Sequence, residues 1–131
     1  MGGSHDLEAM LAELRARYFP GCAEVEIMWG RWPGSGKHRS IRFGVYQPEK
    51  HRIRIHPALN QACVPRYFME FIIYHELLHH VIPAVRVNGR YQIHSAAFRM
   101  RERAFPWYAE AIAWRKEHLQ GLLASRRPAP P

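Results

Sequence analysis

The chain has 131 residues, 47% apolar content and a formal net charge of +8, values that fit one globular domain with a real core. No apolar run reaches the roughly eighteen residues of a membrane-spanning helix, and the N-terminus lacks the order of a signal peptide. Cys22 and Cys63 lack CxxC spacing, which disfavours a cysteine zinc site and suits a reducing compartment. We therefore expect a cytoplasmic protein with one domain over residues 6–124, a tag or disordered segment at 1–5 and a disordered tail at 125–131.

The first forty residues predict a helix, a strand and a loop. Between residues 6 and 18, apolar side chains recur along one stripe, which predicts an amphipathic helix that ends at Phe19-Pro20-Gly21. The weak alternation of residues 25–29 predicts a first strand. Residues 31–37 contain Trp32 together with proline and glycine, so we expect a loop there.

Two further strands are predicted around the turn at residues 47–50. They span residues 40–46 and 51–56, and both show alternation of apolar and polar side chains. The inner side of this pair is expected to carry the apolar residues Ile41, Phe43, Val45, Ile53 and Ile55.

Residues 65–83 predict a helix that is buried on almost all sides, because apolar residues recur at three- and four-residue steps and prolines bound it. This helix contains His75-Glu76-Leu77-Leu78-His79, an HExxH motif. Positions i and i+4 share one helix face, so both imidazoles can point at one metal ion, and Glu76 is close enough to deprotonate a metal-bound water. Burial of these groups without a partner would be costly, so a zinc site is predicted.

The remainder of the chain predicts two more helices. Residues 83–90 contain proline, asparagine and glycine, and we expect a loop or short turn that reverses the chain. A helix then follows Ser95, a suitable N-cap, with apolar contacts expected from Ala97, Phe98, Met100 and Phe105. Phe105-Pro106 begins a last amphipathic helix that continues to Leu122.

A catalytic zinc usually has three protein ligands, so one more is expected beyond His79. His94 is favoured because imidazole suits zinc and because the residue stands at the start of the helix after Ser95. Glu102 is the alternative, although the neighbouring arginines at 99, 101 and 103 favour a salt-bridge role for it. His80 points off the motif face and is expected in a supporting or surface position.

These features resemble the SprT-like, WLM and YgjP-like metallopeptidase relatives. The HExxH motif, the block His94-Ser95-x-x-Phe98 and the later Phe105-Pro106 carry the resemblance. The upstream segment agrees with it through Gly44-Val45-Tyr46 and then Ile53-Arg54-Ile55 with Pro57 and Leu59. The resemblance covers about residues 25–115 and implies a minimal zincin-like α+β domain, with a small antiparallel sheet packed on helices that include the HExxH helix. It also implies that His75, His79 and His94 bind one zinc ion, with Glu76 as general base.

The implied activity is that of a zinc metallopeptidase acting on peptides or proteins, with DNA-associated proteins among the candidate substrates. Zinc held by three imidazoles would activate a water and polarise a peptide carbonyl, while Glu76 moves the proton to the leaving amine. In zincins an extended substrate can pair with a strand, and residues 51–56 are the candidate strand here. Tyr91 and Arg99 are candidates for stabilising the oxyanion, although core packing and solvent exposure explain them equally well.

Two other functions stay open. One is a nucleic-acid-binding module with a chiefly structural zinc site; the other, within the resemblance, is a YgjP-like metal-dependent phosphoanhydride hydrolase. Residues 37–54 hold six lysines and arginines against the single acid Glu49. Arg42, Arg52 and Arg54 are expected to share the outer face of the strand pair and could bind a DNA backbone weakly, although solvation of that face explains the same charges.

Overall fold

The computed structural model describes residues 5–31 and 42–124, and this part of the chain has the predicted α+β composition. Its elements in chain order are α1 (Leu7–Tyr18), β1 (Glu26–Trp29), β2 (Gly44–Gln47), β3 (Arg52–Ile55), α2 (Arg66–Val81), β4 (Val85–Val87), β5 (Arg90–Gln92), α3 (Ala96–Arg103) and α4 (Tyr108–Ala124). The predictions for residues 1–4, for Trp32 and Ile41 and for the tail at 125–131 lie outside the described residues. His5 is described, and its Nε2 atom lies 3.1 Å from the carbonyl oxygen of Gln61.

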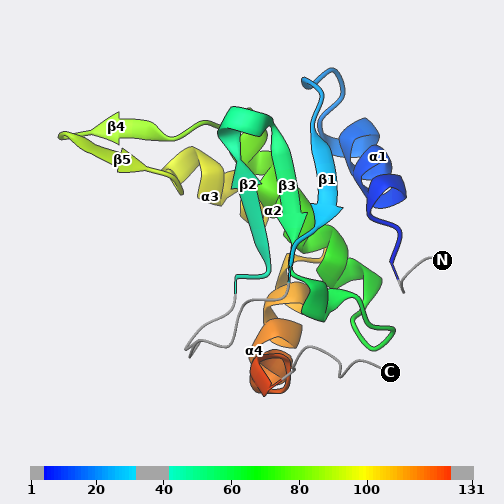
Figure 1. Cartoon of the computed structure of the whole chain (residues 1–131). Coiled ribbons are helices and arrows are strands. Elements are labelled where there is room, and N and C mark those ends of the chain that lie inside the picture. Colours follow the sequence, from blue (N-terminus) through cyan, green and yellow to red (C-terminus); the bar gives the residue numbers. More distant parts are fainter. Residues whose placement is uncertain (1–4, 32–41, 125–131) are drawn as a thin grey trace.

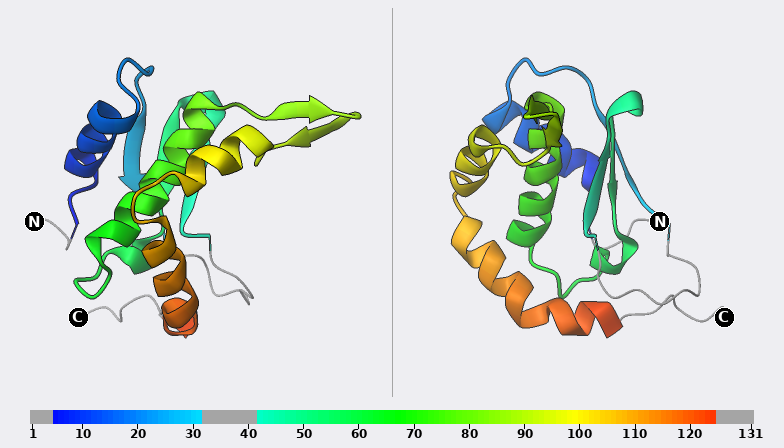
Figure 2. Two further views of the ribbon diagram at one scale, coloured as in Figure 1. Left: turned by 180° about the vertical axis from the view of Figure 1, so that it is seen from behind. Right: turned by 90° about the vertical axis from the view of Figure 1, so that its left-hand side faces the viewer.

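The helix that carries HExxH, α2, lies at the centre of the molecule, as Figure 1 shows. It packs against β2 and β3 on one side and against α3 and α4 on the other, an arrangement clearest in the right-hand view of Figure 2. Helix α1 covers β1 and contacts α2. The prediction that this helix is buried almost all round is confirmed, since Phe68, Met69, Ile73 and Leu77 are fully buried.

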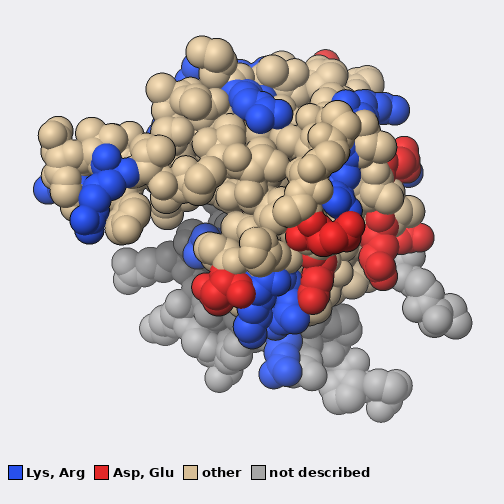
Figure 3. Space-filling view, turned by 90° about the horizontal axis from the view of Figure 1, so that it is seen from above, with Lys and Arg blue, Asp and Glu red and all other residues tan. Residues whose placement is uncertain are grey.

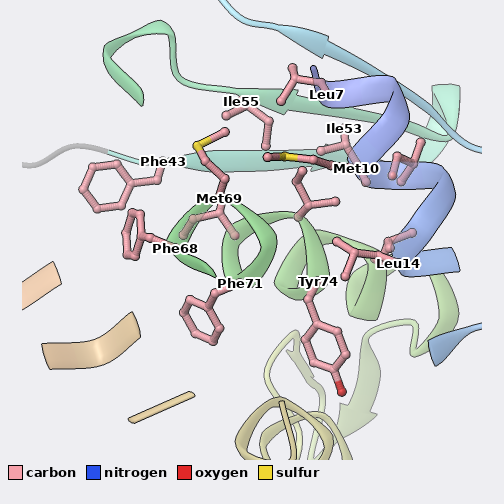
Figure 4. Close-up of a cluster of buried hydrophobic side chains, with 14 of the residues drawn as sticks. Leu7, Met10, Leu14, Phe43, Ile53, Ile55, Phe68, Met69, Phe71 and Tyr74 are labelled. Atoms are coloured by element: carbon pink, nitrogen blue, oxygen red, sulfur yellow. The ribbon is translucent and has the colours of Figure 1, made fainter. Parts of the chain in front are cut away.

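The core between α1, β3 and α2 is shown in Figure 4, where Leu7, Met10, Ile53, Ile55 and Met69 converge. The predicted N-cap at Ser95 is confirmed, and Asp6 is a second cap, because helix N-termini leave backbone N–H groups that short polar side chains can satisfy. The Asp6 carboxylate accepts from the Ala9 N–H at 3.1 Å, and the Ser95 hydroxyl accepts from the Phe98 N–H at 3.3 Å. Among the described residues, no helix combines the length and the apolarity needed to cross a membrane.

The larger sheet has the strand order β1-β3-β2 and is mixed, not antiparallel as predicted. β1 runs parallel to β3, whereas β2 runs antiparallel to it. Strand β3 is therefore the central strand, and neighbouring strands occupy both of its edges. The expectation that residues 51–56 could pair with a substrate is wrong for this reason. In the described part of the chain, the edge nearest α2 belongs to β2.

The side of β2 that faces the core differs from the predicted alternation. Gly44 pairs with Ile55 and Tyr46 pairs with Ile53. Both isoleucines are fully buried, and directly paired residues share one face of a sheet, so these two positions of β2 face α2. Val45, between them, points to the opposite face. Its predicted inner position is wrong.

The three arginines expected on the outer face do not share it. Arg52 and Arg54 of β3 lie there, and the Arg52 Nε atom is 2.8 Å from a carboxylate oxygen of Glu26 on β1. Arg42 instead lines a cavity beside α2. Arg42 lies two residues before Gly44, whose position faces α2, so the predicted alternation is one residue out of phase here.

The chain reverses within residues 83–90 as predicted, although these residues are more than a loop or short turn. They belong to a β4–β5 hairpin that projects from the body of the molecule (Figure 1, Figure 2). Asn88 and Gly89 form its tip with positive φ angles of 51° and 79°. An Asn-Gly pair flanked by alternating residues is a strong hairpin signal in a sequence, so local chemistry explains this correction. In α3, Phe98 is buried as expected, whereas Met100 is 72% exposed and makes no core contact of the kind predicted.

Candidate metal centre

Three imidazoles converge where α2, the end of the β4–β5 hairpin and the start of α3 meet. The Nε2 atoms of His75 and His79 are 3.3 Å apart, and those of His79 and His94 are 3.1 Å apart. One ring nitrogen from each of the three residues lies within 4.8 Å of the others. The helical i, i+4 spacing brings the first two together, and the hairpin returns the chain so that His94 completes the group.

This geometry fits a zinc ion. Ligand nitrogens that lie about 2.0–2.1 Å from a tetrahedral zinc are roughly 3.3 Å from one another, which is close to both separations found here. Bare ring nitrogens at such distances repel each other unless a proton or a metal ion lies between them. His75, His79 and His94 could therefore hold one metal ion.

The ring of Phe98 supports all three imidazoles. It is fully buried, and its centre is 5.0 Å from that of His75, 4.5 Å from that of His79 and 4.9 Å from that of His94. A rigid aromatic surface beneath the rings restricts their rotation, so the nitrogen positions are fixed before any ion binds.

Glu102 contacts the metal site from behind and is not a member of the three-residue group. Its Oε2 atom is 2.5 Å from Nδ1 of His75. A carboxylate accepts, so Nδ1 of His75 carries the proton and Nε2 is free to bind a metal. The predicted salt bridge with the neighbouring arginines is wrong, because no described arginine lies within ion-pair distance of this carboxylate. Burial works to raise the pKa of Glu102, but the hydrogen bond and charge of His75 lower it overall.

The environment keeps the other two imidazoles neutral, which is the form that binds metal. Burial lowers the pKa of His79 to about 4, assisted by the positive charges that His75 and His94 would carry. Burial also lowers the pKa of His94. The backbone of His94 is held in turn by Arg99, whose Nε donates to its carbonyl oxygen at 3.1 Å.

Glu76 is the one buried charged residue among those described, with 5% of its surface exposed. Burial raises its pKa to about 7, and the nearby positive charges of His75 and Arg42 oppose the rise. Gly44 of β2 gives it room: a Cβ atom there would lie 2.8 Å from Oε2 of Glu76 and 3.0 Å from Cγ2 of Ile72. Glycine inside a strand is a signal for such a close approach, although the sequence did not reveal what approaches.

A cavity of about 990 Å³ opens in front of these groups. All three histidines and Glu76 line it, so the metal centre and the carboxylate share one space. Its walls come from β2, α2, β5 and α4 and from the segments next to them. Arg42 and Arg115 line it too, and neither was predicted to do so.

His80, expected in a supporting or surface position, lines one end of this cavity and forms hydrogen bonds to two other segments. Its Nε2 lies 2.9 Å from the carbonyl oxygen of Ala23, which can only accept, so Nε2 carries the proton. Its Nδ1 then accepts from the Tyr46 hydroxyl at 2.7 Å. This pair ties α2 to β2 and to the segment before β1. Burial raises the pKa of Tyr46, so its hydroxyl remains a donor at neutral pH.

The two oxyanion candidates have different positions. Tyr91 lines the cavity and is 68% exposed, so core packing does not explain it. Arg99 lies outside the cavity lining and is occupied by the backbone of His94. Tyr91, Arg42 and Arg115 are exposed residues of the cavity wall that carry side-chain donors.

Comparison of the chain with protein-family models, with curated proteins and with solved structures found no match. The resemblance to SprT-like and related metallopeptidases therefore stays a prediction. A function for this chain has to be inferred from the chemistry of its own residues.

Proposed function

We propose that this protein is a zinc-dependent hydrolase of peptide bonds. The observation that carries the proposal is the convergence of three imidazoles beside a buried carboxylate, all on the wall of one cavity. Three neutral nitrogen ligands leave a coordination position for water or substrate, which distinguishes catalytic zinc sites from structural ones. His94 is exposed and the group faces a cavity, whereas a structural zinc would have a fourth protein ligand.

His75, His79 and His94 would hold the ion. Zinc supplies a Lewis acid that lowers the pKa of a water and polarises a carbonyl group. Glu76 would accept the proton of the attacking water and deliver it to the leaving amine. Its burial supports this role, because a carboxyl group with a raised pKa is a stronger base near neutral pH. Glu102 would orient His75 through the hydrogen bond to Nδ1.

An extended substrate would bind along β2 and not along β3, because β3 has no free edge. Gly44 and Tyr46 of β2 line the cavity beside Glu76. A peptide paired with this edge would offer its backbone to the site through main-chain hydrogen bonds, independently of most side chains. Tyr91 of β5, which also lines the cavity, would donate to the oxygen that becomes negatively charged.

The test compares four proteins on casein and on a mixture of unmodified peptides: zinc-loaded wild type, chelated wild type, Glu76→Gln and Glu110→Gln. Glu110 is exposed on α4 and outside the cavity, so its variant is a matched loss of one carboxylate. We expect Glu76→Gln to keep its zinc and to lose cleavage by about a hundredfold or more. Glu110→Gln should cleave like wild type. Cleavage that persists in Glu76→Gln or after chelation would overturn the proposal.

A further inference from the structure

The cavity in front of the metal centre is cationic at one end. Among the described residues that line it, the fixed positive charges are Arg42 and Arg115 and the one carboxylate is Glu76. Neither arginine lies within ion-pair distance of a described carboxylate, whereas Arg15, Arg52 and Arg66 each have such a partner. Both guanidinium groups are exposed and therefore accessible to a ligand.

Aromatic packing brings together the two backbone segments that carry these arginines. Arg42 precedes Phe43, whose ring centre is 5.6 Å from that of Phe68. Arg115 follows Trp114, whose ring centre is 4.6 Å from that of the same Phe68. One buried ring therefore joins the backbone segments that carry both arginines. Tyr46 and His80, which also line the cavity, lie at the far end of β2.

The wall next to the arginines is apolar. Phe43 follows Arg42 in the cavity lining, and Phe71 and Ile72 line the cavity one helical turn before His75 and Glu76 on α2. A charge next to an apolar wall is less screened than one on an open surface, so attraction to an anion is stronger there. Guanidinium groups also match carboxylates in geometry, because their N–H donors can engage both oxygens.

We propose that Arg42 and Arg115 form an anion-binding subsite, and that the cavity selects peptides with an acidic side chain near the bond to be cleaved. This inference rests on the proposed function for its substrate class. It adds a specificity that the metal centre alone does not provide, since zinc and Glu76 act on the peptide bond itself. An acidic side chain held at the arginines would fix the register of an extended peptide along β2.

The test uses the Glu76→Gln protein loaded with zinc, so that bound peptides are not consumed. The probes are N-acetylated, C-amidated hexapeptides of Ala, Gly and one Phe, in which each position in turn is Glu or Gln. Affinities are measured by calorimetry at 0.15 M salt. At one position we expect the Glu peptide to bind about five- to tenfold more tightly than the Gln peptide. Adding Arg42→Gln and Arg115→Gln should reduce that ratio to less than about two.

The matched control adds Arg17→Gln and Arg103→Gln, which remove two exposed charges outside the cavity and should leave the ratio unchanged. A ratio of one at every position in the parent protein overturns the proposal. The proposal is also overturned if the control variant loses the Glu-to-Gln affinity ratio to the same extent. It is overturned as well if Arg42→Gln/Arg115→Gln weakens the binding of the Glu and Gln peptides equally, because the arginines would then not distinguish a charged side chain from a neutral one. Tighter binding of tripolyphosphate than of any peptide, abolished by the arginine pair, also overturns it in favour of a phosphoanhydride substrate.

The outcome is separable from that of the proposed function, because binding is measured without cleavage. If the protein has no peptidase activity but still prefers Glu peptides, the proposed peptidase function is wrong and the proposed anion-binding subsite stands. If the protein cleaves peptides but shows no preference for Glu in binding, only the proposed anion-binding subsite is wrong.

Discussion

A hydrogen bond of 2.5 Å joins Nδ1 of His75 on α2 to Oε2 of Glu102 on α3. His94 and Glu102 are the two alternatives for the third ligand in the sequence, and this contact gives them different roles. Glu102 fixes the tautomer of His75 from behind, and His94 supplies the third nitrogen in front. The two roles have different consequences for metal binding.

We therefore predict that His94→Ala and Glu102→Gln affect zinc unequally. Purified wild type should carry close to one zinc per chain, and His94→Ala should lose most of it because a ligand is missing. Glu102→Gln should keep the stoichiometry but bind zinc about 10- to 100-fold more weakly. Metal analysis and competition with a zinc indicator measure both values. Unchanged zinc in His94→Ala would remove His94 from the site and restore Glu102 as the ligand.

Zinc removal should also weaken the fold, because the ion would link α2 to the segment that leads into α3. An ion that binds the native state alone stabilises it by mass action, by about 4 kcal/mol at a thousandfold excess over Kd. We expect a chelator to lower the melting temperature by about 10 °C or more. His94→Ala should not respond to the chelator. Identical melts of wild type with and without chelator would contradict this linkage.

The metal-free protein should lose stability relative to its Glu76→Gln variant as pH rises. Burial raises the pKa of Glu76 from 4.5 to about 7, so the folded state holds this proton more tightly than the unfolded state does. The resulting stabilisation is complete below the unfolded pKa and is lost as pH rises through the folded pKa. Glutamine does not titrate. Between pH 5 and pH 8 the variant should therefore gain about 2–3 kcal/mol over wild type in the free energy of unfolding. Urea unfolding in the presence of a chelator measures both proteins. If the difference in their free energy of unfolding does not change with pH, the carboxyl group of Glu76 is not buried as described.

Gly44→Ala should disturb the site through β2. The added Cβ would lie 2.8 Å from Oε2 of Glu76, so the strand or the carboxylate has to move. We expect a loss of about 1–3 kcal/mol in stability, together with lower activity. Gly121→Ala is the matched control on α4, where a Cβ meets nothing within 4 Å, and alanine there should be neutral or stabilising. Equal melts of the two variants would show that β2 lies farther from Glu76.

Nucleic-acid binding through Arg42, Arg52 and Arg54 stays a prediction with weaker support than the sequence suggested. On the face shown in Figure 3, lysines and arginines lie in separate places among uncharged and acidic residues. Arg52 is paired with Glu26 and Arg42 lies beside the cavity. We expect binding of a labelled DNA duplex at low salt to disappear by about 0.15 M salt, where exposed charges are screened. Binding that survives this salt and is abolished by replacing all three arginines with Glu would reverse the expectation. Fluorescence anisotropy of the labelled duplex measures this binding.

Much of the candidate site follows from local sequence. His75 and His79 share a helix face because four residues make about one turn, and Glu76 follows directly. The caps at Asp6 and Ser95 are likewise local, since a short polar side chain reaches only the backbone of the next turn. The chain reversal at Asn88-Gly89 likewise follows from local sequence, whereas the flanking strands β4 and β5, for which the same pair is a hairpin signal, are not among the predicted elements.

The tertiary structure decided what depends on contacts between distant segments. That β1 pairs with β3, and so leaves the edge to β2, depends on packing across a sequence separation that no local pattern encodes. The packing of Gly44 against Glu76 and Ile72 decides that Gly44 and Tyr46 of β2 face α2, one residue out of phase with the predicted alternation, and Arg42 therefore lies at the cavity. Glu102 reaches His75 only because α3 packs on α2, a contact between two helices that sequence spacing cannot specify.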